Sequence, residues 1–385
     1  MTKIIFWLVF FIIFYTYIGY TGICMALAKI FGGKVKKTDF YPEISIIIPC
    51  YNEEKIICQK LENTLSLEYP KGKLEIIVAS ESDDKTNEIV SEFKDEGIKL
   101  YAYENRRGKT VLLYNTIPEA KGEIIIFSDA NALYKKDAVK KIAGNFYEDR
   151  VGAVVGCLMI NNPDASAISK GEYIYKKYEM LLRKANSSLG RTLNADGSIF
   201  AVRKKLYRPI SPERGDDFEL VIRVLISGHI SLFEPEAISY EEASVTPKAE
   251  TARKIRMVSW FLKSSIILLK EMFLKLRFDL ILQIISHKLL RWFSPYFFIA
   301  LFILNLLLWK GPFIYSFFLI IQIFLYLIGI LGIYISGAKK KKAPFMLEMM
   351  QYFMMFNYAF AIGTFKGLLS HKTSSPNWEK VRTSE

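Results

Sequence analysis

The stretch that decides the fold is Ile124-Ile125-Ile126-Phe127-Ser128-Asp129-Ala130-Asn131. Apolar β-forming residues stop there at two oxygen-bearing side chains, Asp129 and Asn131, which are spaced one residue apart. Open α/β sheets bind ligands at the carboxyl ends of their strands, and carboxylate and amide oxygens are ligands for hard divalent cations. The stretch therefore predicts a buried strand that carries two metal-binding oxygens to the edge of such a sheet.

Two other apolar strands end in polar residues in the same way. Ile44 to Pro49 is followed by Cys50-Tyr51-Asn52-Glu53-Glu54, and Leu74 to Ala79 is followed by Ser80-Glu81-Ser82-Asp83-Asp84. From residue 41 to residue 133, short β-branched runs alternate with amphipathic helical runs, an order typical of parallel strands linked by helices. We therefore expect an α/β domain with a mostly parallel sheet whose strands converge on one acidic rim.

The two ends of the chain are apolar enough to meet lipid. Of the 385 residues, 51% are hydrophobic, and the 25 residues between Lys3 and Lys29 carry no formal charge, which is enough for a helix across the hydrocarbon core of a membrane. We expect an uncleaved N-terminal transmembrane anchor over residues 1–33. Uncharged runs on both sides of Lys310 predict a helical hairpin that turns at Lys310-Gly311-Pro312, within C-terminal transmembrane helices over residues 291–370.

Two further segments allow alternatives. Residues 246–290 are amphipathic, with cations interleaved among apolar side chains, and such helices either lie at a membrane surface or pack against the soluble domain. Met349 to Phe365 is apolar but contains Gln351 and Asn357, so it either spans the membrane or lies in its interface. Residues 371–385 form a tail.

The formal net charge of +13 has a topological explanation. Lys34, Lys36 and Lys37 follow the first apolar segment, and Lys339 to Lys342 follow the hairpin. Because short basic segments beside membrane spans are retained inside, we expect a multi-pass protein of the cytoplasmic membrane, in contact with membrane lipids, with residues 40–245 in the cytoplasm. The cations are scattered or juxtamembrane, so we expect no nucleic-acid partner, and the four cysteines lack metal-binding spacing.

Taken in order, the motifs resemble the membrane-integrated family 2 glycosyltransferases, which have a GT-A fold and include polysaccharide synthases and lipid-linked sugar transferases. The resemblance covers nearly the whole chain. The matching segments are Ser45 to Glu54, Ser80 to Thr86, Arg107-Gly108-Lys109, Ser128 to Asn131, Gly197 to Arg203, Gly215-Asp216-Asp217 and, in the tail, Trp378 to Arg382. The resemblance implies an α/β GT-A catalytic domain of the nucleotide-diphospho-sugar transferase type.

The donor implied by the resemblance is a nucleotide sugar, usually a UDP-sugar. Its diphosphate leaves with the help of Mg²⁺ or Mn²⁺, which Asp129 and Asn131 would hold. The family usually has Asp at the third position of this motif, so Asn131 keeps an oxygen ligand but loses a charge. Capping of a helix N-terminus is the alternative role for Asn131.

Other donor contacts rest on the same resemblance. The segment that lies along the base and ribose is matched by Pro49, Tyr51, Asn52 and Glu53. Glu81 stands near the position of a family aspartate that contacts uracil, and Asp83 is its rival because this loop is one residue shorter than the commonest form. Lys109 matches a lysine of the donor site, and a solvated helical lysine is the alternative.

The base implied by the resemblance is Asp217. It matches the second acid of the family's Glu-Asp pair, with Asp216 in place of Glu. A sugar hydroxyl is a poor nucleophile until its proton is removed, whereas capping of a helix is the other role of such a pair. Attack opposite the leaving nucleotide inverts the anomeric configuration.

One motif departs from the family. Processive members carry Gln-x-x-Arg-Trp, but this chain has Thr251-Ala252-Arg253-Lys254-Ile255-Arg256-Met257, with Trp260 displaced. Arg253 and Arg256 are expected to reach the donor diphosphate or a lipid phosphate. The leading expectation is inverting transfer to a growing cell-surface polysaccharide or glycan. Single-sugar transfer to a lipid-linked acceptor is a close alternative, and a non-catalytic scaffold of a polysaccharide secretion complex is the second.

Overall fold

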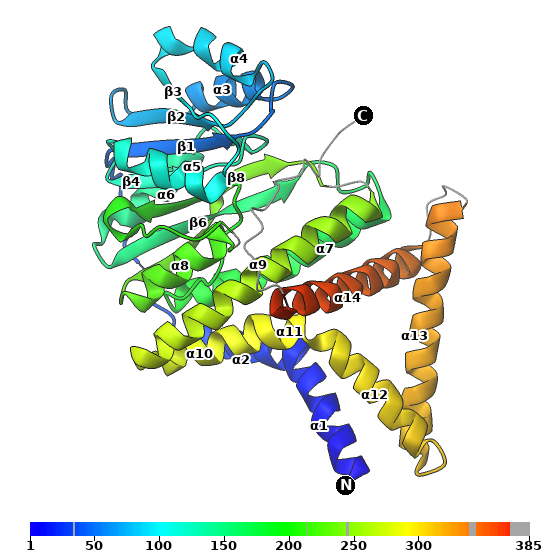
Figure 1. The fold of residues 1–385 in the computed structure, drawn as a ribbon. Coiled ribbons are helices and arrows are strands. Elements are labelled where there is room, and N and C mark those ends of the chain that lie inside the picture. Colours follow the sequence, from blue (N-terminus) through cyan, green and yellow to red (C-terminus); the bar gives the residue numbers. More distant parts are fainter. Residues whose placement is uncertain (34, 213, 244–245, 339–343, 370–385) are drawn as a thin grey trace.

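An eight-stranded sheet forms the centre of the computed structural model, which describes residues 1–33, 35–212, 214–243, 246–338 and 344–369. The strand order is β3-β2-β1-β4-β7-β6-β8-β5 (Figure 1). The strands are β1 Ile44–Cys50, β2 Leu74–Ser80, β3 Ile98–Ala102, β4 Ile124–Phe127, β5 Leu133–Tyr134, β6 Val151–Ile160, β7 Phe200–Arg203 and β8 Ile230–Glu241.

The sheet has a parallel half and a mixed half. Strands β3, β2, β1 and β4 are all parallel, as the alternating pattern up to Leu133 predicts. Strand β7 then pairs antiparallel with β4 and with β6, and β8 returns parallel to β6. The expected α/β class is confirmed, and the sheet is mixed because strands after residue 150 run in both directions.

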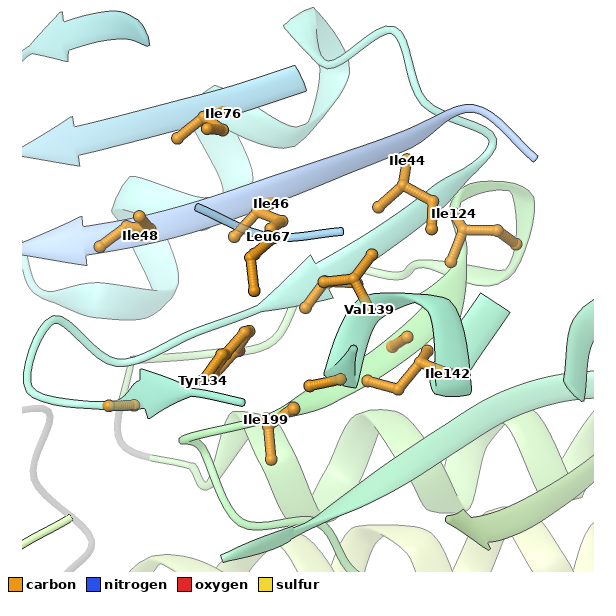
Figure 2. Close-up of a cluster of buried hydrophobic side chains, with 14 of the residues drawn as sticks. Ile44, Ile46, Ile48, Leu67, Ile76, Ile124, Tyr134, Val139, Ile142 and Ile199 are labelled. Atoms are coloured by element: carbon orange, nitrogen blue, oxygen red, sulfur yellow. The ribbon is translucent and has the colours of Figure 1, made fainter. Parts of the chain in front are cut away.

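Helices cover both faces of the sheet, and the core is divided accordingly. Side chains alternate along a strand, so Ile44, Ile46 and Ile48 point to one face, toward α3 and α6 (Figure 2). Ile47 points to the opposite face, where it joins a cluster with Leu113 of α5 and residues of α8. The helices named here are α3 Ile57–Leu65, α5 Lys109–Thr116, α6 Ala138–Ala143 and α8 Asp216–Ile226, with α4 Thr86–Glu92 beside α3.

A second layer of helices packs below the sheet. It consists of α7 Ala167–Ser188, α9 Pro247–Leu274 and α14 Phe345–Leu369. Glycines bring α14 close to the other two: a Cβ at Gly171 would lie 2.3 Å from Tyr352 Cγ, and one at Gly363 would lie 2.8 Å from Val258 Cβ. Of the two alternatives for residues 246–290, packing against the rest of the protein is therefore seen for α9. Contact of this region with a membrane surface stays a prediction.

Two helices in the described residues are long and apolar enough to cross a membrane, Thr2–Phe31 and Phe313–Ile335. The first comprises α1 Thr2–Phe14, a π-helical turn and α2 Tyr20–Phe31. The second is part of α13 Phe313–Ala338. Helix α12, Ser294–Leu308, qualifies only together with Phe278–Trp292, from which it is bent by 62°. That preceding segment comprises α10 Phe278–Ile284, the π-helical turn η6 Ile285–Leu289 and α11 Leu290–Trp292.

The apolar helices lie on the side of the molecule away from the sheet. Helices α1 and α12 extend away from the sheet-containing part near α11, and the chain reverses between α12 and α13 (Figure 1). This reversal falls at Lys310-Gly311-Pro312, where the hairpin turn is predicted. Helix α14 contains Met349 to Phe365 and is not among the candidate spans. The Lys339 to Lys342 cluster and the tail over residues 371–385 lie outside the described residues.

Candidate functional site

A cavity of about 350 Å³ opens where β1 and β4 end, between the sheet and the second layer of helices. Its charged residues form two walls. The strand-end wall consists of Glu53, Lys109, Asp129, Asp196, Arg214, Asp216, Asp217 and Glu241. The helix wall consists of Lys176, Glu179 and Arg183 of α7, Arg253, Lys254 and Arg256 of α9, Lys288 of η6 and Arg291 of α11.

Asp129 is held at the carboxyl end of β4 by a buried lysine. The Lys109 ammonium lies 3.0 Å from Asp129 Oδ1 and 3.3 Å from Asp216 Oδ2. Burial by itself lowers the pKa of Lys109, but the carboxylates of Asp129, Asp216 and Asp217 outweigh burial and hold its pKa above the usual value. Only 13% of the Lys109 side chain is exposed, so the solvated-lysine alternative is wrong.

The second oxygen of Asp129 faces a glycine. A Cβ at Gly197 would lie 2.9 Å from Asp129 Oδ2, so any larger residue there would crowd this oxygen. The described residues contain no group of three or more His, Cys, Asp or Glu side chains that could hold a metal. A divalent cation with few protein ligands and several phosphate or water oxygens fits this arrangement. The carboxylate of Asp129 and the amide oxygen of Asn131 are the hard ligands that the chain offers.

Asn131 lies in a turn that lines the cavity. No helix begins there, because the next strand is β5 and the next helix, α6, has Asp137 as its N-cap. Helix capping by Asn131 is therefore wrong, and metal binding by Asn131 stays a prediction. Beneath the turn, the fully buried Lys60 donates a hydrogen bond to the carbonyl of Ala132. Lys60 therefore positions the turn. Its place on the apolar stripe of α3 was the feature of the sequence that could have indicated a buried lysine.

The segment after β1 reaches the cavity in part. Tyr51 and Glu53 line it, and the Arg106 guanidinium lies 3.9 Å from the centre of the Tyr51 ring. Asn52 has a φ of 55° and ties two loops together: its backbone N–H donates to Ser82 Oγ at 2.9 Å. Its side-chain oxygen accepts a hydrogen bond from the Asp83 N–H at 3.0 Å. Pro49 lies inside β1 and, like Asn52, does not line the cavity.

The rival residues Glu81 and Asp83 lie beside the cavity but not in its lining. Glu81 accepts a hydrogen bond of 2.9 Å from the backbone N–H of Gly108. Gly108 has a φ of 94°, a conformation that favours glycine, and it precedes Lys109. Glu81 thus orients the loop that delivers Lys109, whereas the Asp83 side chain is exposed. The contact of either residue with a nucleobase stays a prediction.

Asp216 and Asp217 open α8, so their carboxylates lie in its first turn, where the helix dipole favours negative charge. Both also line the cavity, so the helix-start position does not exclude a role in the site. Burial is the main reason that the pKa of Asp217 is raised to about 8. The Asp216 carboxylate adds to the rise, and Lys109 opposes it. A carboxylate with such a pKa is a competent general base near neutral pH.

Asp196 is a site residue that the sequence analysis missed. It accepts hydrogen bonds from Lys176 at 2.6 Å and from Arg183 at 2.5 Å. Burial by itself raises the pKa of Asp196, but these two cations outweigh burial and hold its pKa well below the usual value. Because Gly197 follows Asp196, the two ion pairs fix the loop that faces Asp129. No local pattern revealed this role, since Lys176 and Arg183 lie in the preceding helix, 20 and 13 residues away, and approach Asp196 only after the chain turns back.

On the helix wall, the predicted arginines differ in their partners. Arg253 donates to both carboxylate oxygens of Glu250, at 2.8 and 2.7 Å, and to Glu172. The guanidinium of Arg256 lies 5.5 Å from the centre of the Trp260 ring. Trp260 lines the cavity although it is displaced in sequence. A contact of either arginine with a phosphate stays a prediction.

The sequence is similar to those of known glycosyltransferases. Residues 45–210 match the model of the glycosyl transferase family 2. The probable glycosyltransferase YdaM of Bacillus subtilis is 29% identical over 268 residues, which cover 66% of this chain and 63% of the relative. The poly-beta-1,6-N-acetyl-D-glucosamine synthase of Staphylococcus epidermidis is 32% identical over 164 residues, 42% of this chain and 39% of that one. The chain thus spans less than two thirds of the length of these relatives.

Among solved structures, the fold is similar to that of a mannosyltransferase from Pyrobaculum calidifontis in complex with GDP-Man and Mn²⁺. The TM-score is 0.71 with 18% sequence identity, and the superposition covers 97% of this chain and 100% of the other. At this identity the similarity establishes the fold, which is of the GT-A type. It extends over the second layer of helices and the apolar helices as well as the sheet.

Proposed function

The chain belongs to glycosyl transferase family 2 through residues 45–210, and from that premise we propose that it transfers a sugar from a nucleoside diphosphate to a hydroxyl acceptor with inversion. The observation that carries this proposal is the convergence of Asp129, Lys109 and Asp217 on one cavity. These residues offer a hard metal ligand, a buried cation and a base of raised pKa within a single site.

In this proposal the donor lies along the strand-end wall. Tyr51 and Glu53 flank the nucleoside, and Asp129 with Asn131 would hold Mg²⁺ or Mn²⁺ at the diphosphate. A cation held there would supply positive charge to offset that of the leaving diphosphate. The similar mannosyltransferase is a complex with GDP-Man and Mn²⁺, which supports a nucleotide-sugar donor and a divalent metal for this chain too.

The remaining steps belong to the side chains. Asp217 accepts the proton of the acceptor hydroxyl, and its raised pKa makes it an effective base near neutral pH. Lys109 fixes Asp129 and Asp216 by ion pairs, so the base lies next to a preorganised charged group. Asp196 keeps the Gly197 loop against Asp129. Attack from the Asp217 side, opposite the diphosphate, converts an α-linked donor into a β-linked product.

The setting that we propose is the cytoplasmic membrane, with residues 40–245 in the cytoplasm. The helices Thr2–Phe31 and Phe313–Ile335 are long and apolar enough to span, and Lys36 and Lys37 follow the first of them. The acceptor is a growing polysaccharide or glycan, in keeping with the similarity to a poly-N-acetylglucosamine synthase. Single transfer to a lipid-linked acceptor is the second candidate, favoured by the cationic helix wall next to the apolar helices. A non-catalytic scaffold is disfavoured because Asp129 and Asp217 are both retained.

The test is a donor screen on the purified full chain in lipid nanodiscs. UDP-sugars and GDP-sugars are offered with Mg²⁺ or Mn²⁺, nucleotide release is measured, and the product is analysed by mass spectrometry. Turnover of one donor with a β-linked product supports the proposal, and the product length separates polymerisation from single transfer. Nucleotide-sugar binding without turnover across a broad acceptor panel would instead support the scaffold.

A further inference from the structure

We propose that the helix wall contains a binding site for the phosphate group of a lipid acceptor, formed by Lys176, Arg183, Lys288 and Arg291. This inference rests on the proposed function, because it assigns the acceptor end of the same cavity. The ligand class is a lipid in which phosphate joins a long apolar chain to the sugar that carries the acceptor hydroxyl. Its phosphate would lie among the four cations, and its chain would follow the apolar helices.

The first argument is charge. The four cations share only two carboxylates, Asp196 and Glu179. Lys176 and Arg183 both pair with Asp196, whereas Arg291 and Lys288 both pair with Glu179, with Lys288 at 3.5 Å. All six residues line the cavity. The cluster therefore carries two excess positive charges, which the negative charge of the lipid phosphate would offset.

The second argument is burial. The exposed fractions of the side chains are 15% for Lys176, 8% for Arg183, 8% for Lys288 and 3% for Arg291. Charges withdrawn from water are costly unless they are paired, so two uncompensated buried cations demand an explanation. A bound anion supplies the missing charge. By contrast, Arg253 and Lys254 on the same wall face two buried carboxylates, those of Glu250 and Glu172.

The third argument is hydrogen bonding. Within the described part of the chain, the Nε atoms of Arg183 and Arg291 are buried and have no hydrogen-bond partner. Buried donors are nearly always satisfied, so these two Nε–H groups are donors that an anion could satisfy. Phosphate oxygens are the acceptors that arginine binds best, often through two parallel bonds. Both the charge and the donors of the cluster therefore fit a phosphate.

The position of the cluster points to a phosphate carried by lipid. Lys288 and Arg291 directly precede α12, whose Ile299, Ile303 and Leu307 are exposed. The N-terminal apolar helix lies alongside, because Tyr15 donates a hydrogen bond to Ser286 and the hydroxyls of Tyr17 and Ser294 lie 2.9 Å apart. In Figure 1 these helices meet at α11, where they leave the catalytic part. A phosphate at this level has an apolar surface beside it for an acyl or isoprenoid chain.

The donor diphosphate is assigned to the other wall. The strand-end wall has six carboxylates and two cations and uses a divalent metal to hold phosphate. The helix wall has seven cations and one carboxylate and needs no metal to hold an anion. Two anionic groups therefore find separate places in one cavity, with Asp217 available to the acceptor hydroxyl.

The experiment measures binding of n-dodecyl phosphate to the purified full chain in a neutral detergent. The matched probes are n-dodecanol and inorganic phosphate, and the variants are Lys288→Gln, Lys288→Arg and Lys176→Gln. Lys275→Gln is the control, since this lysine is about half exposed and does not line the cavity. We expect tight binding of dodecyl phosphate alone, weakened about tenfold or more in each Gln variant, restored in Lys288→Arg and unchanged in Lys275→Gln.

Several results would overturn the inference. Equal binding of dodecanol would mean an apolar site only, and equal binding of inorganic phosphate would mean a free-phosphate site. Displacement of dodecyl phosphate by UDP or GDP with Mn²⁺ would assign the cluster to the donor, and an equal loss in Lys275→Gln would mean surface attraction. Nucleotide release measured on the same samples separates the two proposals. If wild type turns over a donor but ignores dodecyl phosphate, only the present inference fails.

Discussion

The two walls of the cavity differ in charge and in origin. The strand-end wall is acidic and comes from strand ends, loops and helix starts, whereas the helix wall is basic and comes from α7, α9, η6 and α11. On the first wall, Asp129 follows β4 and Lys109 and Asp216 begin helices, although Asp196 is held by cations of α7. On the second, Lys288 and Arg291 share the carboxylate of Glu179, which is more than a hundred residues away in sequence. The comparison teaches that the strand-end wall follows largely from local sequence, whereas the helix wall follows from packing.

The largest effect is expected on the strand-end wall. Asp129→Ala removes the only carboxylate of the Asp-x-Asn motif, so donor turnover should fall by about 1,000-fold or more while the protein stays folded. Nucleotide release is measured against Mn²⁺ and Mg²⁺ concentration. Asp95→Ala is the control, because this aspartate is exposed and does not line the cavity. Full activity of wild type in excess chelator would contradict the expectation.

Asp217→Asn should come next. The amide keeps the shape of the carboxylate but cannot accept the hydroxyl proton, so turnover should fall by about 100-fold or more. Binding of the donor nucleotide with Mn²⁺ should persist, and this is measured by titration on the same sample. A variant that keeps more than about a tenth of wild-type turnover would mean that another residue is the base.

The dependence of kcat/KM on pH tests further whether Asp217 is the base. The pKa of Asp217 is raised to about 8, so below that pH the carboxyl is protonated and cannot act as a base. We therefore expect kcat/KM to rise with pH, about tenfold per pH unit well below the pKa, and to level off above it. The Asp217→Asn variant should lose this limb. A wild-type profile that is flat between pH 6 and pH 9 would exclude Asp217 as the titrating base.

A smaller effect is expected on the helix wall. Arg256 lines the cavity beside Trp260, so Arg256→Gln should lower turnover by about tenfold, the loss of one hydrogen bond to a charged group. The defect should appear even in neutral detergent. Lys270→Gln, at an exposed position of the same helix, is the control. If the Arg256 defect occurs only in anionic bilayers, the residue binds headgroups rather than substrate.

The last prediction concerns the orientation of both walls relative to the membrane, and no change in turnover is expected. With the exposed Cys58 replaced by Ser, Lys36→Cys should react only with reagents that reach the cytoplasm. Lys310→Cys should be labelled from outside, because a hairpin of two spanning helices turns on the far face. Cytoplasmic labelling of Lys310→Cys would make α12 and α13 re-entrant. The lipid chain would then reach the helix wall from the inner leaflet alone.

Sequence reasoning recovered much of the strand-end wall. Asp129 was predicted because it follows an apolar strand, whereas Lys109 and Asp217 were predicted from the resemblance to a family, and all three line the cavity. Two alternatives that the sequence left open are excluded: Asn131 caps no helix, and Lys109 is buried rather than solvated. Lys60 was missed although a lysine on the apolar stripe of a helix is a signal, and Asp196 was missed because an aspartate in a loop looks ordinary without its partners.

What the sequence by itself determined is the class of fold and the edge of the sheet at which polar residues gather. Parallel strands of one sheet must end at the same edge, so polar residues placed after apolar runs converge without further information. The tertiary structure alone decided the mixed half of the sheet, the place of α14 against α7 and α9, and the cluster of Lys176, Arg183, Lys288 and Arg291 around two carboxylates. The pairs of Glu179 with Lys288 and Arg291 join helices more than a hundred residues apart, and only close packing of their side chains selects which charges share a carboxylate.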